Sequence, residues 1–319
     1  MVELKIKPSD VRGFNYHPSY SHDALEGWLL FDEDVWRKEL TNGKNKFPKI
    51  NTVRLWLSWN AYCRLEDEFI DRVRRAIDIC RELDLYVIPC LFNRWLDPKI
   101  NADAVFIDHF LPNSSWLHKY GGLFDEYIDA MCDAFGTEER ILVWDMCNEP
   151  LAYLKGFEFK DLVQHYELNW LRQMADRMRA NKVTQPLGLG STGREPMETF
   201  GDIYDVYLTH LYYKGDDPEL FDNKVARFVA EAEKNERPLI VSECCWGSFD
   251  DKTRAEYIHT TLSIFKKYGL GFVAHALYYC GCTDLHDPCD GRVSPEIGNL
   301  CFINKDGSVR PHHEVFNEF

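Results

Sequence analysis

Short apolar runs alternate along the whole chain with segments whose apolar residues recur at helical spacing. Runs of this kind predict buried parallel strands, and the stripes between them predict helices that cover the strands. The predicted strands are residues 11–16, 52–58, 85–92, 141–147, 186–191, 206–211, 239–242 and 271–278. Eight strands, each followed by a helix, predict an α/β fold of the (β/α)8 TIM-barrel type.

The predicted helices lie between these strands, and a short one closes the chain. They fall in residues 32–40, 69–83, 124–135, 159–181, 221–232, 257–265 and 314–319. An open doubly wound sheet is the alternative, but it usually carries a glycine-rich phosphate turn after its first strand. Here that position reads Phe14-Asn15-Tyr16-His17, which favours the barrel.

The length of 319 residues suits one barrel, and no Ser-, Gly- or Pro-rich linker or internal repeat divides the sequence. We therefore expect a single catalytic domain spanning 1–319. The oligomeric state stays open.

The chain is acidic, with 37 Lys and Arg residues against 52 Asp and Glu residues and a formal net charge of -15. This charge argues against nucleic acid or an anionic membrane as a partner, although solubility alone also explains it. A neutral sugar is unaffected by such a field, whereas a polyanionic substrate would need a local basic pocket.

Cysteine usage and the chain start indicate a cytoplasmic protein. Several of the eleven cysteines (Cys80, Cys90, Cys132 and Cys147) fall inside predicted core elements, as expected for free thiols in a reducing compartment. The first residues contain no apolar stretch long enough for a signal peptide, and no segment has the length of a membrane span. A signal peptide removed beforehand remains an alternative.

Two glutamates stand at the ends of predicted strands. Glu149 follows the fourth strand in Asn148-Glu149-Pro150, and Glu243 ends the seventh. Strand ends of a (β/α)8 barrel meet at one mouth, so these carboxylates are expected to face each other. A retaining glycosidase requires such a pair about 5 Å apart, one protonated and one ionised.

These strand ends resemble clan A of the glycoside hydrolases, and most closely the family 5 cellulases and mannanases. Residues 144–150 resemble the acid/base motif of that family, and Val241-Ser242-Glu243 resembles its nucleophile strand. The resemblance implies Glu149 as the acid/base and Glu243 as the nucleophile. It covers essentially the whole chain at low similarity.

The same resemblance extends to residues around the two glutamates. Arg54 on the second strand resembles the arginine that holds the nucleophile, and it could keep Glu243 ionised through a charge-assisted hydrogen bond. His210 and Tyr212 resemble the histidine and tyrosine of the sixth strand. Being two residues apart, they should point the same way. Asn148 offers a donor and an acceptor to a sugar hydroxyl.

Two positions depart from the family pattern. Where the third strand of family 5 usually ends with a histidine, this chain has Asn93. Where the eighth strand usually carries a tryptophan under the sugar, this chain offers His275 or one of the tyrosines, Tyr278 or Tyr279. Substrate assignments from the family therefore do not transfer to this chain.

Further candidates lie beyond the strand ends. Trp95 and Trp246 are the best-placed aromatic platforms for a sugar ring, and Asp284 and His286 are candidates to contact hydroxyls. The Cys- and Asp-rich segment 280–290 matches no familiar zinc spacing, and we expect no metal and no cofactor. Long segments follow the third and eighth strands, and such loops commonly shape the specificity of a barrel. We expect a pocket and not an open cleft, because the sequence shows no accessory binding module and no export signal.

The leading interpretation is a retaining β-glycosidase that acts on oligosaccharides or glycosides by double displacement. A transglycosylase would use the same pair of glutamates. A non-catalytic carbohydrate-binding barrel is a further alternative. A phosphate-binding isomerase is disfavoured, because residues 244–247 make a poor phosphate loop.

Overall fold

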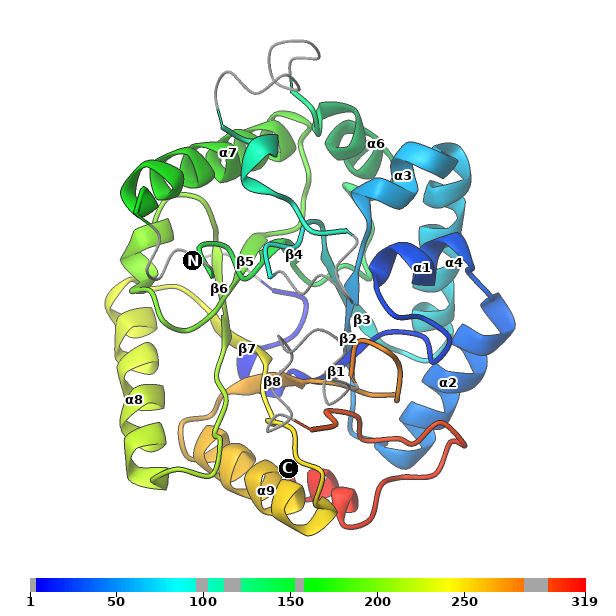
Figure 1. Cartoon of the computed structure of the whole chain (residues 1–319), viewed down its shortest axis with the longest axis vertical. Helices are drawn as coiled ribbons and strands as arrows, with labels where there is room; N and C mark the ends of the chain where they lie inside the picture. The colour runs from blue at the N-terminus through cyan, green and yellow to red at the C-terminus, as the bar shows by residue number, and fades with distance from the viewer. Residues whose placement is uncertain (1–3, 96–102, 112–121, 153–157, 284–297) are drawn as a thin grey trace.

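Eight parallel strands close into a barrel in which each strand pairs with the next and β8 pairs with β1 (Figure 1). The computed structural model describes residues 4–95, 103–111, 122–152, 158–283 and 298–319. The strands are β1 Arg12–Tyr16, β2 Thr52–Trp56, β3 Tyr86–Cys90, β4 Trp144–Asn148, β5 Leu187–Ser191, β6 Val206–His210, β7 Leu239–Glu243 and β8 Gly271–Ala274. The predicted TIM barrel is confirmed.

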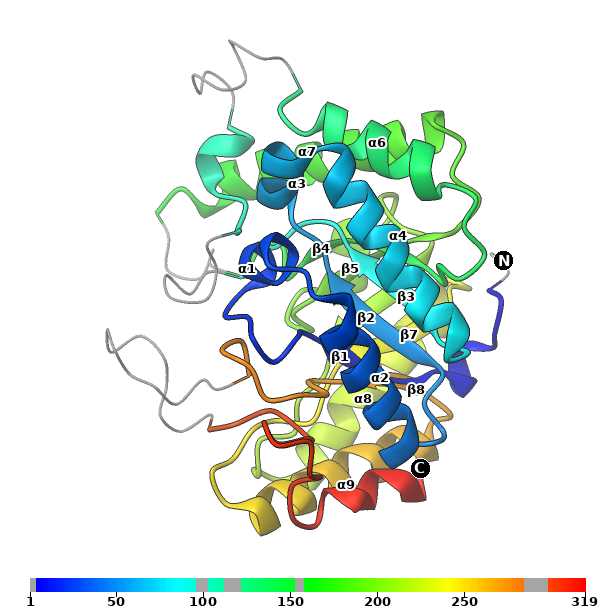
Figure 2. The same ribbon diagram turned by 90° about the vertical axis from the view of Figure 1, so that its right-hand side faces the viewer.

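Helices surround the barrel on its outside (Figures 1 and 2). They are α1 Ala24–Leu29, α2 Glu33–Lys46, α3 Trp59–Leu65, α4 Asp67–Glu82, α6 Asp125–Phe135, α7 Lys160–Ala180, α8 Pro218–Lys234 and α9 Asp251–Lys267. Acidic and hydroxyl side chains fix several starts. Asp32 accepts from two backbone N–H groups of α2, and Asp250 caps α9.

The expectation that a helix follows every strand is wrong at two places. Between β5 and β6 the chain forms only a 3-10 turn, Met197–Phe200, because Gly193, Pro196 and Gly201 interrupt this short connection. The final segment is likewise a 3-10 helix, His313–Glu318. Conversely, α1 and α3 were not anticipated.

Strand β8 is shorter than predicted, because the chain leaves the sheet after Ala274. The N–H of Ala276 donates to Leu300 O at 2.9 Å, and the N–H of Tyr279 donates to Ile303 O at 2.9 Å. Residues 300–303 thus pair with the segment after β8, while the N–H of Leu277 still donates to Asn15 O in β1 at 2.9 Å. His275 and Tyr279 consequently lie in a loop at the strand end.

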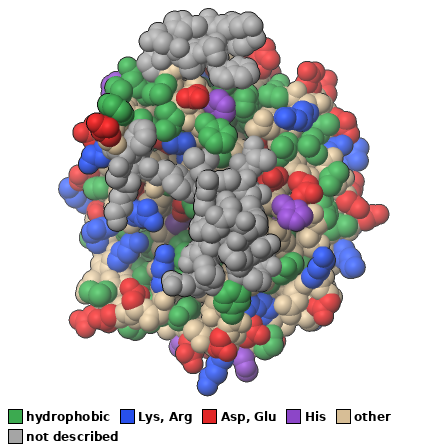
Figure 3. All heavy atoms as spheres, in the orientation of Figure 1, with side chains coloured by type: hydrophobic (Ala, Val, Ile, Leu, Met, Phe, Trp, Pro, Cys, Tyr) green, Lys and Arg blue, Asp and Glu red, His purple; other side chains and the backbone are tan. Residues whose placement is uncertain are grey.

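Acidic side chains are spread around the surface that faces the viewer in Figure 3, as the net charge of -15 leads one to expect. No helix in the described parts of the chain is both long and apolar enough to cross a membrane. The cysteines predicted to be core thiols, Cys80, Cys90, Cys132 and Cys147, are buried and free.

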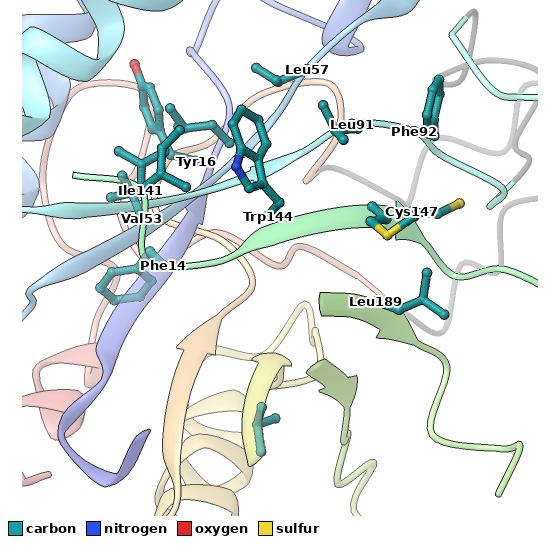
Figure 4. Close-up of a cluster of buried hydrophobic side chains, with 14 of the residues drawn as sticks. Phe14, Tyr16, Val53, Leu57, Leu91, Phe92, Ile141, Trp144, Cys147 and Leu189 are labelled. Carbon is teal, nitrogen blue, oxygen red and sulfur yellow. The ribbon is translucent and has the colours of Figure 1, made fainter. Parts of the chain in front are cut away.

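The core has two layers, as the alternation of side chains along each strand requires. A smaller cluster includes Ile88, Val206, Ile240 and Val273 from different strands. The larger cluster packs strands against helices. Figure 4 shows Phe14, Val53, Trp144 and Leu189 in this layer.

Gly13 is required by the close approach of β1 and β2. A Cβ at this position would lie 2.1 Å from Thr52 O, a backbone atom that cannot move without disturbing the sheet. We expect Gly13→Ala to lower the free energy of unfolding by about 1–3 kcal/mol. Urea denaturation measures this, with Gly27→Ala as the control, because a Cβ there meets only ordinary contacts at 3.5 Å. Equal stability of the two variants would contradict the tight packing of β1 on β2.

Candidate active site

The guanidinium of Arg54 lies inside the barrel near the carboxyl ends of the strands and is fully buried. Its Nε donates to Asp145 Oδ2 at 2.8 Å, and its Nη1 donates to Glu243 Oε1 at 2.6 Å. It also donates to Oδ1 of Asn15 and of Asn148, each at 2.8 Å. Burial alone would lower the pKa of Arg54, but Asp145 and Glu243 raise it above its usual value. Arg54 therefore stays charged.

Asp145 is the carboxylate that fixes Arg54 to the barrel wall. It is fully buried and accepts from the backbone N–H of Gly190 at 2.9 Å. A Cβ on Gly190 would lie 2.8 Å from Asp145 Oδ2 and 3.0 Å from Arg54 Nη2. The absence of a side chain at Gly190 in β5 thus leaves room for the ion pair.

Glu243 is the last residue of β7 and is buried. Besides Arg54, its carboxylate accepts from the Tyr212 hydroxyl, with Oε2 at 2.8 Å. Burial, and then the charge of Glu243, raises the pKa of Tyr212 well above its usual value, so this hydroxyl remains a donor. Each oxygen of the Glu243 carboxylate is therefore held by one donor.

Glu149 has a different environment. It directly follows β4 with a φ of 48°, and its side chain retains 17% exposure. Burial raises the pKa of Glu149 to about 7, although Arg194, Arg54 and Lys214 act in the opposite direction. Its Oε1 lies 2.8 Å from Nδ1 of His210, the last residue of β6. Near neutral pH this carboxyl group can therefore carry a proton.

The two glutamates meet beside His210. One carboxylate oxygen of Glu149, one of Glu243 and a ring nitrogen of His210 lie within 4.8 Å of one another. Burial lowers the pKa of His210 to about 4, so its ring is neutral. Such a donor set could also approach a divalent cation, but Arg54, 2.6 Å from Glu243, already supplies a positive charge there.

The turn that carries Glu149 is held by a buried ion pair. Leu151 has a φ of 64°, and its N–H donates to Glu167 Oε1 at 3.0 Å. Glu167 pairs with Arg94 at 2.8 Å, and both side chains are almost completely buried. Because φ values above zero are strained for these residues, this pair stabilises the turn that aims the Glu149 side chain.

Hydrogen bonds connect Asn148, Asn93 and Trp95. Asn148 Nδ2 donates to Asn93 Oδ1 at 2.9 Å, and the same oxygen accepts from the Trp95 N–H at 2.9 Å. Asn93 Nδ2 in turn donates to Trp95 O. These contacts fix Asn148 against Arg54, while sugar contacts by the three residues stay a prediction.

The remaining predicted site residues lie around the same strand ends or outside the described chain. His275 follows β8 and is buried. Burial, followed by the charges of Arg54 and His210, lowers its pKa to about 3. The Trp246 ring lies 5.1 Å from the Tyr212 ring, and Tyr279 is partly exposed. Asp284 and His286 lie outside the described residues, as do parts of the long segments expected to shape a pocket.

Several residues of this centre were missed from the sequence. Asn15 and Asp145 carry a usable signal, since each is a polar residue inside an otherwise apolar strand, where burial demands a partner. The sequence gives no such signal for Gly190, Arg94 or Glu167, because their roles depend on contacts between segments that are distant in the sequence.

The model of the cellulase family, glycosyl hydrolase family 5, matches residues 41–281. No curated protein matches the sequence significantly. Among solved structures, an exo-β-1,4-mannosidase from Opitutaceae bacterium strain TAV5 superposes with a TM-score of 0.74 at 17% identity, over 100% of this chain and 61% of that one. This chain thus spans about three-fifths of the mannosidase.

Two further structures share the fold at low identity. A GH5_18 protein from Streptomyces cattleya in complex with GlcNAc gives a TM-score of 0.67 at 16% identity, covering 97% of this chain and 80% of its own. An endo-β-1,4-mannanase from Thermotoga petrophila gives 0.62 at 14% identity, covering 97% and 77%. At these identities the likeness concerns the fold alone.

Removing the charge of Asp145 tests whether the centre depends on the buried ion pair. We expect Asp145→Asn to lower the free energy of unfolding by about 3–5 kcal/mol, because Arg54 would lose a buried partner. Asp202→Asn removes a carboxylate that pairs with Arg172 on the surface at 3.1 Å and should cost about 0–1 kcal/mol. Urea denaturation compares the two, and similar losses would contradict this role of Asp145.

Proposed function

The chain belongs to the cellulase family, glycosyl hydrolase family 5, and we propose that it is a retaining β-glycosidase acting on oligosaccharides or glycosides. One observation carries this proposal: a Glu149 oxygen and a Glu243 oxygen lie within 4.8 Å of each other, the pKa of Glu149 is raised to about 7, and Glu243 accepts a hydrogen bond from Arg54. A separation near 5 Å is typical of retention, since an inverting enzyme needs room for water between its carboxyl groups.

In the first step the Glu243 carboxylate attacks the anomeric carbon while the Glu149 carboxyl group donates its proton to the leaving oxygen. The glycosidic bond breaks, the aglycone departs as an alcohol and an ester forms between Glu243 and the sugar. In the second step Glu149, now a carboxylate, takes a proton from water as the water attacks the same carbon. The ester bond breaks, and both side chains return to their starting states.

Arg54, Tyr212 and His210 position the reacting groups in this scheme. Arg54 and Tyr212 hold one oxygen each of Glu243, which orients the carboxylate and fixes its charge. His210, neutral and beside both glutamates, holds Glu149 at 2.8 Å. The other proposed contacts to carbohydrate are Asn93, Trp95, Asn148, Trp246, His275, Tyr279, Asp284 and His286.

Substitution of each glutamate by glutamine tests the two roles. We expect Glu149→Gln to reduce kcat on β-glycosides with poor leaving groups by about 10²–10⁴-fold, and Glu243→Gln to remove turnover on all β-glycosides. The screen covers nitrophenyl and alkyl β-glycosides of glucose, galactose, mannose, xylose and fucose. Glu236→Gln, which changes a residue just before β7, is the control.

Added azide distinguishes the roles by product stereochemistry. With Glu149→Gln, azide should attack the glycosyl-enzyme and yield the β-glycosyl azide. With the Glu243 side chain shortened to alanine, azide should take the place of the nucleophile and yield the α-glycosyl azide. Inverted first products from the unaltered enzyme, or wild-type rates in either glutamine variant, would overturn the proposal.

The pH dependence follows from the proton that Glu149 must carry. Its pKa is raised to about 7, so the protonated fraction decreases as the pH rises through that value. We expect kcat/KM for an alkyl β-glycoside to fall above about pH 7, with a slope of one proton. In Glu149→Gln this alkaline limb should disappear. If kcat/KM of Glu149→Gln still decreases above this pH, the decrease is caused by the titration of another group.

A further inference from the structure

Three aromatic side chains with ring nitrogens lie together where β1, β2 and β8 end, three strands that pair with one another (Figure 1). His17 follows β1, Trp56 is the last residue of β2, and His275 follows β8. The ring centres of His17 and Trp56 are 5.0 Å apart. The ring of His275 lies 6.2 Å from the first and 6.5 Å from the second. We call these three residues the ring cluster.

The ring cluster faces the inside of the barrel. Side chains two residues apart on a strand point to the same side, and the three members follow Asn15, Arg54 and Val273 at that spacing. Asn15 and Arg54 are hydrogen-bonded to each other inside the barrel, and Val273 belongs to the smaller core cluster. The ring contacts of His275 show that this direction continues just beyond the end of β8. The ring cluster is therefore the next layer of inward side chains toward the mouth.

Direct contacts join the ring cluster to the proposed catalytic centre. Arg54 Cζ lies 5.5 Å from the centre of the Trp56 ring, and the same guanidinium donates to Glu243 at 2.6 Å. The backbone N–H of His275 donates to Cys244 O at 3.0 Å, and Cys244 directly follows Glu243. The ring cluster and the proposed nucleophile are thus parts of one packed unit.

Each member of the ring cluster has a buried ring nitrogen without a hydrogen-bond partner in the described residues. These atoms are Nε2 of His17, Nε1 of Trp56 and Nδ1 of His275. The two histidines are deeply buried, with exposed fractions of 3% for His17 and 7% for His275. A buried polar atom that lacks a partner destabilises the fold, so three of them in neighbouring rings indicate a polar ligand.

Two other rings with an unpartnered nitrogen have different surroundings. Trp170 Nε1 and His313 Nε2 also lack partners in the part of the chain that the structure describes. The Trp170 ring, however, packs on Phe92 at 5.2 Å and on Phe110 at 5.6 Å, and the His313 ring packs on Phe302 at 5.5 Å. Only apolar rings surround these nitrogens in the contacts described. The grouping of polar rings at the barrel mouth, beyond the lack of partners, therefore marks the site.

The ring cluster has the hydrogen-bonding capacity that a hydroxyl group requires. Burial is the main cause that lowers the pKa of His17 and the pKa of His275 to about 3, so both imidazoles are neutral near neutral pH. A neutral imidazole has one donor and one acceptor nitrogen, and the indole of Trp56 has a donor only. A hydroxyl group both donates and accepts, so it can satisfy each of these nitrogens.

The position of the ring cluster indicates which part of a substrate it meets. In a closed barrel of eight strands, β8 lies opposite β4 and β1 lies opposite β5 (Figure 1). Glu149, which follows β4, protonates the leaving oxygen in the proposed reaction, so the leaving group lies on that side. The anomeric carbon lies between Glu149 and Glu243, and the sugar that becomes bonded to Glu243 extends to the opposite side. That sugar, the glycone, is the part nearest the ring cluster.

Resting on the function proposed above, we propose that the ring cluster is the wall of the glycone subsite, and that His17, Trp56 and His275 bind free hydroxyl groups of the glycone. The specificity for the glycone then depends on hydrogen bonds to three ring nitrogens. A sugar that lacks one of these hydroxyl groups leaves the corresponding nitrogen unpaired.

Substrates that lack single hydroxyl groups test this role. The nitrophenyl β-glycoside that is hydrolysed fastest is compared with derivatives that each lack one hydroxyl group of the glycone. We expect His17→Phe, Trp56→Phe and His275→Phe each to lower kcat/KM for the complete substrate by about three- to tenfold, the range for a neutral hydrogen bond. The loss should be smaller for the derivative without the hydroxyl group that the residue binds. Equal losses on the complete substrate and on every derivative, as expected if the nitrogens hold only a structural water, would overturn the inference.

Matched variants separate the nitrogen from the ring. His17→Gln places an amide near the position of Nε2, and His275→Asn places one near the position of Nδ1, so both should keep more activity than the phenylalanine variants. Trp170→Phe removes a buried indole N–H that lies in α7, outside the site, and should leave the ratios between substrates unaltered. A change of these ratios in Trp170→Phe as large as in Trp56→Phe would contradict the assignment.

A binding measurement separates failure of this inference from failure of the proposed function. Proton–nitrogen correlation spectra of protein labelled in its histidine rings are recorded with added glucose, galactose, mannose, xylose or fucose, and need no turnover. We expect at least one sugar to shift the signals of His17 and His275, identified with the Gln and Asn variants, and to leave the exposed His165 unchanged. Such shifts without hydrolysis of any glycoside support the ring cluster, and only the proposed function fails. Hydrolysis with equal losses on all derivatives and no shift overturns this inference alone.

Discussion

A guanidinium removed from water must keep its positive charge balanced, and the buried position of Arg54 imposes this requirement on the centre of the barrel. Asp145 and Glu243 supply the negative charges, and Asn15 and Asn148 accept the remaining hydrogen bonds. Four strands thereby contribute to one network. Because a buried charge without partners costs several kcal/mol, the requirement fixes these side chains relative to one another.

The two glutamates also differ in their hydrogen-bond partners. Glu243 contacts the guanidinium of Arg54 directly, whereas Glu149 contacts the neutral ring of His210, and burial raises the pKa of Glu149 to about 7. Neighbouring carboxylates with unlike partners are the arrangement that lets one act as an acid while the other acts as a nucleophile. The strained turn after β4, held by Glu167 and Arg94, determines where the Glu149 side chain points.

The barrel could be predicted from the sequence because periodicity is a local property that each strand and helix carries by itself. Glu149, Glu243 and Arg54 could be placed for a similar reason, since strand ends of a barrel converge. The missing helix after β5 has a local signal in Gly193, Pro196 and Gly201, which strand–helix alternation alone does not take into account. The early end of β8 could not be predicted, because it depends on pairing with the distant residues 300–303. Gly190 illustrates this limit, since its role is the space that it leaves for Arg54 and Asp145.

The proposed cycle also changes the charge around Arg54. When Glu243 becomes an ester, one of the two anions that balance the guanidinium disappears, while Asp145 remains. Arg54 already acts to lower the pKa of Glu149, and in the intermediate less of its charge is compensated. The pKa of Glu149 should therefore fall at the stage where this residue must accept a proton from water. A single buried cation can in this way favour the acid before the ester forms and the base after it.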